Sequence, residues 1–246
     1  MALQLGPCMV LMAGLHNGTA SFTGTIDADD TTIPFTAASG TWPDRGVFQL
    51  ESELILYMEK DDDANVFRNC LRGFKGTTAA AHDGSGDPLD ITLQYSDLGK
   101  TEGGVTVAAS ESTVQLRSDQ SGETPEDEVV SGTPVTITLN LADITLDNFA
   151  MVHKSTVEGT APNRKVVVYA NVGKSLKSMA KKALIVPYAG EALSNDVEDI
   201  IVVPQAGIKA AEELVYNFSD QRVIRVELSA YPDTAGRVLI FGDENA

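Results

Sequence analysis

Short runs that alternate strictly between apolar and polar residues are the feature that most constrains this fold. In residues 135–141, valine, isoleucine and leucine occupy every second position, with threonine and asparagine between them. Because successive side chains of a strand point to opposite faces, this pattern predicts a strand with one buried face. Residues 225–230 repeat the pattern. Residues 105–116 do so with one change of phase between Ser110 and Thr113, which predicts a β-bulge or a bend there.

Uninterrupted apolar runs predict further strands that are covered on both faces. They lie at residues 165–169, 183–186, 200–203 and 237–241. Helix signals are few. Thr145 is a suitable N-cap for one short helix, with the carboxylate of Asp147 in its first turn. We expect that helix over residues 146–153, with Leu146, Phe149, Ala150 and Val152 facing the sheet. No series of strand–helix–strand crossovers is present, so the sequence predicts a mainly antiparallel β fold.

Residues 15–90 have the character of a separate small β domain inserted between two strands. Short strand patterns at 31–35, 46–57 and 67–72 are joined by acidic and glycine-containing turns. An insertion at a hairpin tip costs little because the entropy of loop closure grows only logarithmically with length. The sequence therefore predicts a discontinuous domain, residues 1–14 and 91–246, with residues 15–90 as an autonomous insert.

The charge balance excludes a protein that grips nucleic acid by its phosphates. The 246 residues carry 18 Lys and Arg against 35 Asp and Glu, which gives a formal net charge of −17. Binding of that kind requires a concentrated basic face. Solubility or a saline habitat explains the acidity equally well. We also expect free thiols at Cys8 and Cys70, and no targeting or membrane-spanning segment, because residues 1–15 are short and interrupted by Gly6-Pro7.

No motif in the chain has the composition of a catalytic or cofactor site. Gly99-Lys100-Thr101 and Gly173-Lys174-Ser175 supply only the end of a phosphate-binding loop, because its first glycine is absent from both. The three histidines match no zinc spacing. Asp61-Asp62-Asp63 lacks the glycine and the glutamate that an EF-hand loop needs. We therefore expect neither an enzyme nor a bound cofactor or metal.

Three stretches, taken in order, resemble the tail tube proteins of tailed bacteriophages. They are residues 98–105 (LGKTEGGV), residues 119–132 (DQSGETPEDEVVSG) and residues 222–243, which contain RVIRVEL, YPD and FGD. Gly6-Pro7-Cys8 at the start adds to the likeness. The resemblance covers most of residues 91–246 and returns at residues 1–14.

The insert resembles a small β module of other phage structural proteins. The similarity lies in residues 53–57 (ELILY), 71–77 (LRGFKGT) and 80–84 (AAHDG). Arg72-Gly73 and Gly76-Thr77 suit a turn that depends on glycine. Arg72 has two alternatives at this stage, an ion pair with Glu53 across the strands or a position in solvent.

The resemblance implies a structural virion protein with the fold of a β-sandwich or half-barrel and one flanking helix. In the family, six copies form a ring whose strands join into a continuous barrel, and rings stack into the tube through which DNA passes. The expected partners are further copies of the chain and the tail terminator, baseplate or tip, and tape measure proteins. The expected location is the virion tail, after synthesis in the host cytoplasm, with residues 15–90 on the outer surface. A lumen of carboxylates and hydroxyls would offer DNA no sites at which to bind.

The resemblance also implies which residues join neighbouring rings. We expect residues 118–131 to form a mobile acidic loop in the free chain that becomes ordered on stacking. Its expected contact residues are Asp119, Glu123, Glu126, Asp127, Glu128, Val129 and Val130. The bases expected to face them are Lys174, Lys177, Lys181 and Lys182. A permanently solvated acidic loop is the alternative.

Two other functions fit the sequence less well. One is a different tail component, such as a terminator, completion or baseplate-ring protein. The other is a secreted β-sandwich module that binds carbohydrate. A single tryptophan, Trp42, and 6% aromatic residues argue against the second alternative, since sugar platforms depend on exposed aromatic rings.

The missing ligand patterns generate a first testable prediction. Elemental analysis of the purified, dialysed protein should find zinc and calcium well below one equivalent per chain, because no group of side chains matches a site for either ion. Stoichiometric metal that survives dialysis would contradict this prediction.

Overall fold

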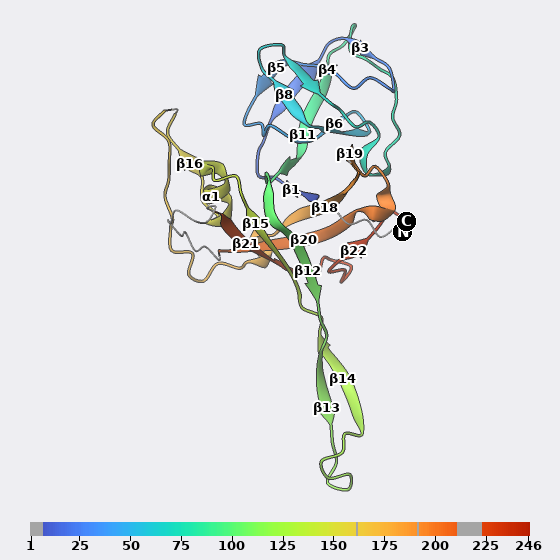
Figure 1. Cartoon of the computed structure of the whole chain (residues 1–246), viewed down its shortest axis with the longest axis vertical. Coiled ribbons are helices and arrows are strands. Elements are labelled where there is room, and N and C mark those ends of the chain that lie inside the picture. The colour runs from blue at the N-terminus through green and yellow to red at the C-terminus, as the bar shows by residue number, and fades with distance from the viewer. Residues whose placement is uncertain (1–6, 161, 191, 211–222) are drawn as a thin grey trace. The chain divides into compact units, whose positions relative to one another are not determined.

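The computed structural model describes residues 7–160, 162–190, 192–210 and 223–246 (Figure 1). In these residues strands predominate and are antiparallel, with one α-helix, which confirms the predicted mainly-β fold with one short helix. Gly6 and Arg222, which contribute to the tail tube resemblance, lie outside the described residues. The chain divides into two compact units.

The first unit contains the residues up to Lys100, Lys181–Val203 and Ile240–Ala246. Its elements are β1 (Cys8–Ala13), β2 (Thr19–Phe22), β3 (Thr25–Ile26), β4 (Ile33–Pro34), β5 (Thr36–Ser39), β6 (Gly46–Leu50), β7 (Glu53–Tyr57), β8 (Glu59–Asp61), β9 (Val66–Arg68), the 3₁₀ turn η1 (Phe74–Gly76), β10 (His82–Asp83), β11 (Leu89–Asp97), β18 (Lys181–Ala189), β19 (Ala192–Leu193), η3 (Val197–Asp199) and β22 (Ile240–Phe241).

The second unit contains Thr101–Ala180 and Pro204–Leu239. Its elements are β12 (Thr101–Ala109), β13 (Ser112–Leu116), β14 (Asp127–Gly132), β15 (Val135–Leu141), α1 (Leu146–Val152), β16 (Val157–Glu158), β17 (Lys165–Val166), η2 (Lys177–Met179) and β21 (Ile224–Ala230). Strand β20 (Ile201–Ala210) begins in the first unit and ends in the second.

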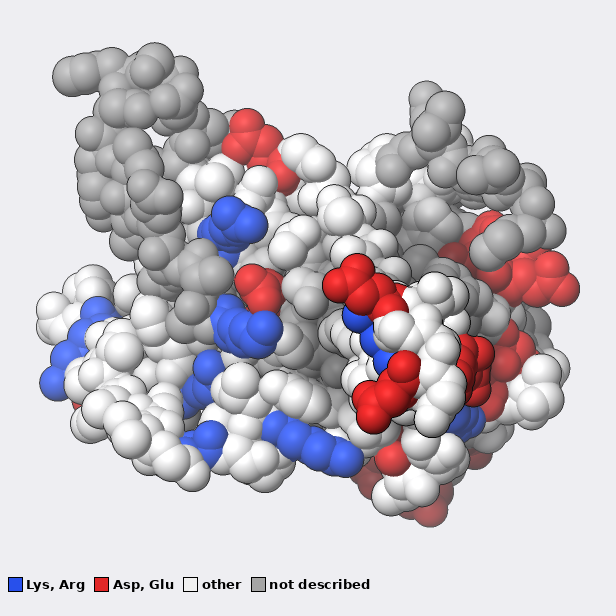
Figure 2. Space-filling model, turned by 90° about the horizontal axis from the view of Figure 1, so that it is seen from below, with Lys and Arg blue, Asp and Glu red and all other residues white. Residues whose placement is uncertain are grey.

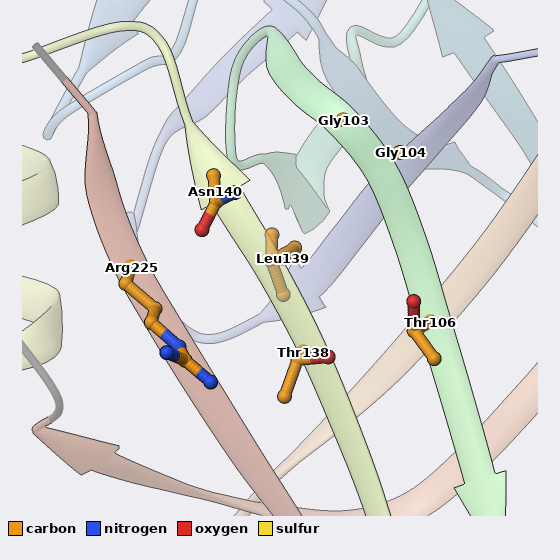
Figure 3. Close-up of a pocket in the computed structure, with 7 residues that line it drawn as sticks. All are labelled: Gly103, Gly104, Thr106, Thr138, Leu139, Asn140 and Arg225. Atoms are coloured by element: carbon orange, nitrogen blue, oxygen red, sulfur yellow. The ribbon is translucent and has the colours of Figure 1, made fainter.

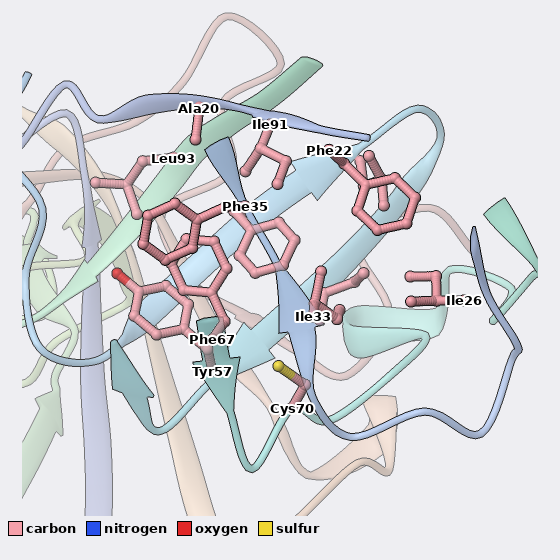
Figure 4. Packing of buried hydrophobic residues seen from close by; sticks show 13 residues of the cluster. Ala20, Phe22, Ile26, Ile33, Phe35, Tyr57, Phe67, Cys70, Ile91 and Leu93 are labelled. Atoms are coloured by element: carbon pink, nitrogen blue, oxygen red, sulfur yellow. The ribbon is translucent and has the colours of Figure 1, made fainter. Parts of the chain in front are cut away.

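An aromatic cluster lies at the centre of the first unit (Figure 4). Phe67 on β9 is its hub, with ring centroids 4.7 Å from both Phe35 and Phe48 and 4.8 Å from Tyr57. Phe67 belongs to the small β4–β9–β8 sheet, whereas Phe48 and Tyr57 belong to β6 and β7 of the main sheet. The rings therefore hold two sheets together in a small sandwich.

The β6–β7 hairpin is buried on both faces, which places residues 15–90 in a common core with the rest of the first unit. Phe48 and Tyr57 point into the aromatic cluster. Val47 and Leu56 join a second cluster that also contains Leu11 and Leu184.

Strand β11 crosses the expected boundary as well. It pairs with β2 over residues 89–92, with β6 over residues 91–96 and with β1 over residues 95–97. The two compact units therefore divide the chain elsewhere than at the predicted 15–90 boundary, because this strand and the second apolar cluster join the insert to its flanks.

A buried carboxylate organises the turns of the first unit. The Glu53 side chain is completely buried and accepts two hydrogen bonds from Arg72, at 2.9 Å from Nε and 2.8 Å from Nη2. The backbone N–H groups of Gly73 and Ala80 also donate to it, and His82 Nε2 lies 2.8 Å from its Oε2. Of the two alternatives for Arg72, the ion pair with Glu53 is therefore the one observed.

These contacts explain the residue types of the Arg-Gly and Gly-Thr motif. Gly73 has φ +62°, and a Cβ there would lie 2.7 Å from the carbonyl oxygen of Thr77. Thr77 Oγ1 accepts from the N–H of Leu54 at 3.0 Å and donates to the carbonyl of Phe74 at 2.9 Å. Arg72 further donates to the carbonyls of Asp27 and Ala80, both at 2.6 Å. One guanidinium thus ties distant loops to the Glu53 carboxylate.

The second unit contains a sheet in the order β12–β15–β21–β20, and its register confirms the predicted alternation. Helix α1 has the predicted N-cap, since Thr145 Oγ1 accepts from the N–H of Asn148 at 3.1 Å. The helix buries Ala150, Met151 and Val152. Leu146 was expected to face the sheet but is exposed, because it occupies the first position of a helix only two turns long.

Two predicted strands are much shorter than expected. The run 165–169 was expected to be covered on both faces, but β17 ends at Val166, and Val168 and Tyr169 are exposed. The run 237–241 forms a strand only at its end, in β22. Both runs are apolar enough for a strand, but a strand also needs a neighbour, and along most of each run none is present among the described residues.

The Glu53 cluster generates the second prediction. Glu53→Gln removes the negative charge that compensates buried Arg72 and should lower the free energy of unfolding by about 3–5 kcal/mol, measured by urea denaturation at neutral pH. Glu51→Gln is the matched control, because Glu51 also contacts His82 but is half-exposed. The control should cost at most about 1 kcal/mol. Equal effects of the two substitutions would contradict the prediction.

The same carboxylate predicts a pH dependence. Burial by itself raises the pKa of Glu53, but hydrogen bonds from Arg72, His82, Gly73 and Ala80 outweigh it and lower the pKa from its ordinary value of 4.5 to about 2. A carboxyl with a depressed pKa stabilises the fold fully above its unfolded value. This contribution should therefore disappear as the pH falls from about 4.5 towards about 2. Unfolding free energies measured across that window should fall more steeply for the natural chain than for Glu53→Gln.

Candidate assembly surface

A long hairpin of the second unit, β13 and β14, carries most of the contact residues expected from the sequence. It continues the β12–β15 pair and projects beyond it (Figure 1). The two pairs are separated at Ser110 and Glu111, so the break predicted from the change of phase is confirmed. The hairpin strands belong to no larger sheet in the described part of the chain. A two-stranded ribbon of this kind has only marginal stability by itself in water.

The register gives the hairpin two different faces. Val114 pairs with Val129 and Leu116 with Asp127, and directly paired residues share a face of an antiparallel sheet. Val114, Leu116 and Val129 therefore form an apolar stripe, and each is about half exposed. The opposite face carries Thr113, Gln115, Glu128 and Val130, and Gln115 Nε2 donates to Glu128 Oε1 at 2.8 Å.

The structure corrects the expected contact set in two ways. Val129 and Val130 were expected to act together, but the strand places them on opposite faces. Val114 and Leu116 were not among the expected contact residues, although their shared parity in the sequence was the available signal. Asp127 lies on the same face as the apolar stripe, whereas Glu128 lies opposite.

The acidic segment 118–131 is less of a loop than expected. Its second half belongs to β14, because Val129 and Val130 find partners in β13. The turn is closed by backbone hydrogen bonds from Glu126 to Leu116 at 2.9 Å and from Thr124 to Ser121 at 3.2 Å. Asp119 and Glu123 are exposed in this turn. Figure 2 views the molecule from below the orientation of Figure 1, with the hairpin pointing towards the viewer, and shows acidic side chains gathered there.

The four expected lysines do not form one cluster. Lys174 and Lys177 belong to the second unit, whereas Lys181 and Lys182 begin β18 in the first. Lys182 already pairs with Glu244. Burial raises the pKa of Glu244, but hydrogen bonds from Lys182 and Lys75 outweigh it, so the pKa is lowered overall. Lys174 and Lys177 have no ion pair with any described residue, which leaves them as the bases best able to meet an external acid.

The sheet of the second unit has one apolar and one polar face. Ile137, Leu139, Val226 and Leu228 are buried on the first. The second is rich in hydroxyl groups and carries balanced charges. Its members are Glu102, Thr106, Thr136, Thr138, Asn140, Lys209, Arg225, Glu227 and Ser229. Lys209 and Glu227 form an ion pair at 2.8 Å.

A shallow depression of about 190 Å³ lies on this polar face (Figure 3). It forms where Gly103 and Gly104, both with positive φ, make a bulge in β12 opposite β15. Thr106, Thr138, Asn140 and Arg225 surround it. Strand β12 ends the order of the sheet, and its outer edge has no partner among the described residues. The half-buried Val105 and Val107 are consistent with an edge that a further strand would complete.

The side chains with potential for chemistry are engaged in structural contacts. His16 Nδ1 lies 2.9 Å from Ser96 Oγ, and both nitrogens of His82 face carboxylates. Asp61 accepts from the backbone of its own turn and from Arg68. Cys8 and Cys70 are free, as predicted. Burial raises the pKa of Cys70 to about 12, which leaves its thiol protonated and unreactive.

A search of the described residues finds no group of three or more His, Cys, Asp or Glu placed to hold a metal ion. The same residues contain no helix that is long and apolar enough to cross a bilayer.

A polar depression of about 300 Å³ on the first unit bears on the carbohydrate alternative. It is lined by Gln49, Glu51, Asp90, Thr92 and Gln94, and no aromatic side chain lines it. Trp42 packs instead against Phe67, with ring centroids 5.2 Å apart. The depression therefore lacks the aromatic platform on which sugar rings stack.

Comparison with known proteins assigns no family to the chain. No protein-family model matches it, and no curated protein sequence matches it.

The two faces of the hairpin generate the third prediction. Val129→Asp places a charge in the apolar stripe and should abolish or strongly reduce self-association, measured by sedimentation of the purified chain. Val130→Asp is the matched control, since it makes the same change at the neighbouring residue with nearly the same exposure, 51% against 49%. Circular dichroism should show that both variants remain folded. Equal loss of association in both would show that the stripe is not the contact.

Proposed function

We propose that this chain is a structural virion protein whose hexameric rings stack into the tail tube that conducts phage DNA into the host. The carrying observation is the projecting hairpin with an apolar face that no described part of the chain covers. Such a surface fits a protein whose fold is completed by other copies of itself. The resemblance in the sequence provides the form of that assembly.

The free edge of β12 supports the ring. A nine-residue edge strand presents unpaired N–H and C=O groups, and proteins normally block such edges or pair them. In the proposed ring, β12 pairs with a strand of the neighbouring copy, and the sheets join into a continuous barrel. The bulge at Gly103-Gly104 fits this role, because bulges bend and twist a strand as a closed sheet requires.

In the proposed tube, the polar face of this sheet lines the lumen. The opposite face is occupied by the core of the unit, so only the polar face is available to water. DNA would meet hydroxyls and balanced charges there, without the net positive charge that would hold phosphates. The acidity of the chain lies elsewhere, including on the hairpin.

The remaining assignments follow from this proposal. The partners are further copies of the chain, with the tail terminator, the baseplate or tip and the tape measure protein at the ends and inside the tube. Residues 15–90, which belong to the first unit, face the outside. No catalytic residue or cofactor forms part of the proposal.

Negative-stain microscopy of the purified full chain tests the proposal and is the fourth prediction. At high protein concentration the chain should form tubes or six-fold rings, because the β12 edge and the hairpin both seek partners. Light scattering should give masses in multiples of six chains. A monodisperse monomer at every concentration would refute the tube assignment and favour a binding module.

A further inference from the structure

The second unit exposes another apolar surface besides the hairpin. Val168, Tyr169 and Val172 are 57%, 62% and 94% exposed. They lie in an extended segment after β17, where the sequence predicted a buried strand. We call residues 167–177 the basic segment, because it also contains Lys174 and Lys177.

The exposure of Val172 is built into the backbone. The N–H of Lys174 donates to the carbonyl of Asn171 at 3.2 Å, which closes a turn. Gly173, at the third position of this turn, has φ +82°, a conformation that favours glycine. Val172 is therefore held at the apex of a defined turn, where no described residue covers it.

Charge distinguishes this segment from the rest of an acidic chain. Residues 159–190 contain six basic residues and neither Asp nor Glu, although acids outnumber bases 35 to 18 overall. Residues 111–128, which span β13 and the hairpin turn, contain six acids and one base. The two regions are thus opposite in charge, and each also exposes apolar side chains.

We infer that the basic segment of one copy is the docking surface for the β13–β14 hairpin of a second copy. The inference rests on the proposed function, which requires the hairpin to meet another ring, and it names the surface that the hairpin meets. The apolar stripe of Val114, Leu116 and Val129 covers Val168, Tyr169 and Val172. Asp127, on the same face as the stripe, meets Lys174.

The division of roles follows from the usual size of each effect. Burial of large apolar side chains stabilises an interface by about 25 cal/mol per Å², whereas an exposed ion pair contributes at most about 1 kcal/mol. The apolar contact therefore provides most of the affinity. The charges select the orientation and speed the encounter, because wrong pairings would place like charges together.

A crosslinking experiment tests the contact without requiring tubes. Two variants are made in a Cys8→Ser background, one with Val129→Cys and one with Val172→Cys, and Cys70 is retained because it is buried. After mild oxidation, a mixture of the two should give a heterodimer joined by a disulfide at least about tenfold more abundant than a mixture in which Val130→Cys replaces Val129→Cys. The Val130 variant is the control, because its side chain lies on the opposite face of the hairpin.

Charge reversal provides an independent readout. Asp127→Lys should lower the yield of this crosslink about tenfold, since it places a base against Lys174. Adding Lys174→Glu on the partner chain should restore the yield. Glu128→Lys, on the opposite face, should leave it unchanged.

The outcomes separate this inference from the proposed function. Tubes in micrographs without the Val129–Val172 crosslink would overturn the docking surface and leave the tube assignment in place. The crosslink with its charge-reversal pattern, but no tubes or rings, would support the docking surface and refute the tube. Crosslinking of Val129→Cys chains mainly to one another would show hairpin–hairpin packing and overturn the inference.

Discussion

The first unit depends on one buried carboxylate. Glu53 has no contact with water, and an ionised carboxylate in such a place is strongly destabilising unless donors surround it. The donors come from three separate segments, Arg72-Gly73, Ala80 and His82. Because Arg72 also holds the carbonyl of Asp27, the position of Glu53 determines where the long connections of this unit lie. A chain with few helices and many short strands needs such a centre, since its turns contribute little apolar burial of their own.

The same geometry accounts for the composition of the motif around it. Arginine is required for two parallel hydrogen bonds to one carboxylate, which lysine cannot make. Glycine is required at Gly73, where the backbone is left-handed and a side chain would collide with the carbonyl of Thr77. His82 brings both ring nitrogens to carboxylates, at 2.6 Å from Glu51 and 2.8 Å from Glu53, and only the doubly protonated ring can donate to both. These residue types therefore have structural reasons, and no catalytic role is needed to explain them.

The second unit differs because its surfaces are left incomplete. The β12–β15–β21–β20 sheet buries one face, but its edge strand has no outer neighbour among the described residues. The hairpin and the basic segment each expose apolar groups that would be buried in an ordinary monomer. Three unfinished surfaces in one unit, two of them of opposite charge, are consistent with a protein that acts as an assembly. The high net charge of −17 opposes that assembly at long range, and salt would relieve the repulsion.

The sequence alone determined the strands with clear alternation, the single capped helix and the break between β12 and β13. In each of these, a local pattern of period two, or a capping residue, is enough to identify the element. It also raised the Glu53–Arg72 pair as an alternative, but only the tertiary structure decided in favour of it, because burial depends on which strands pack above the pair. The fates of residues 165–169 and of Val129 and Val130 were decided in the same way. An apolar run is a buried strand only when a neighbour pairs with it, and two adjacent valines serve one surface only if the backbone is not extended. Register and neighbours are properties of the whole fold, and no short segment of the sequence contains them.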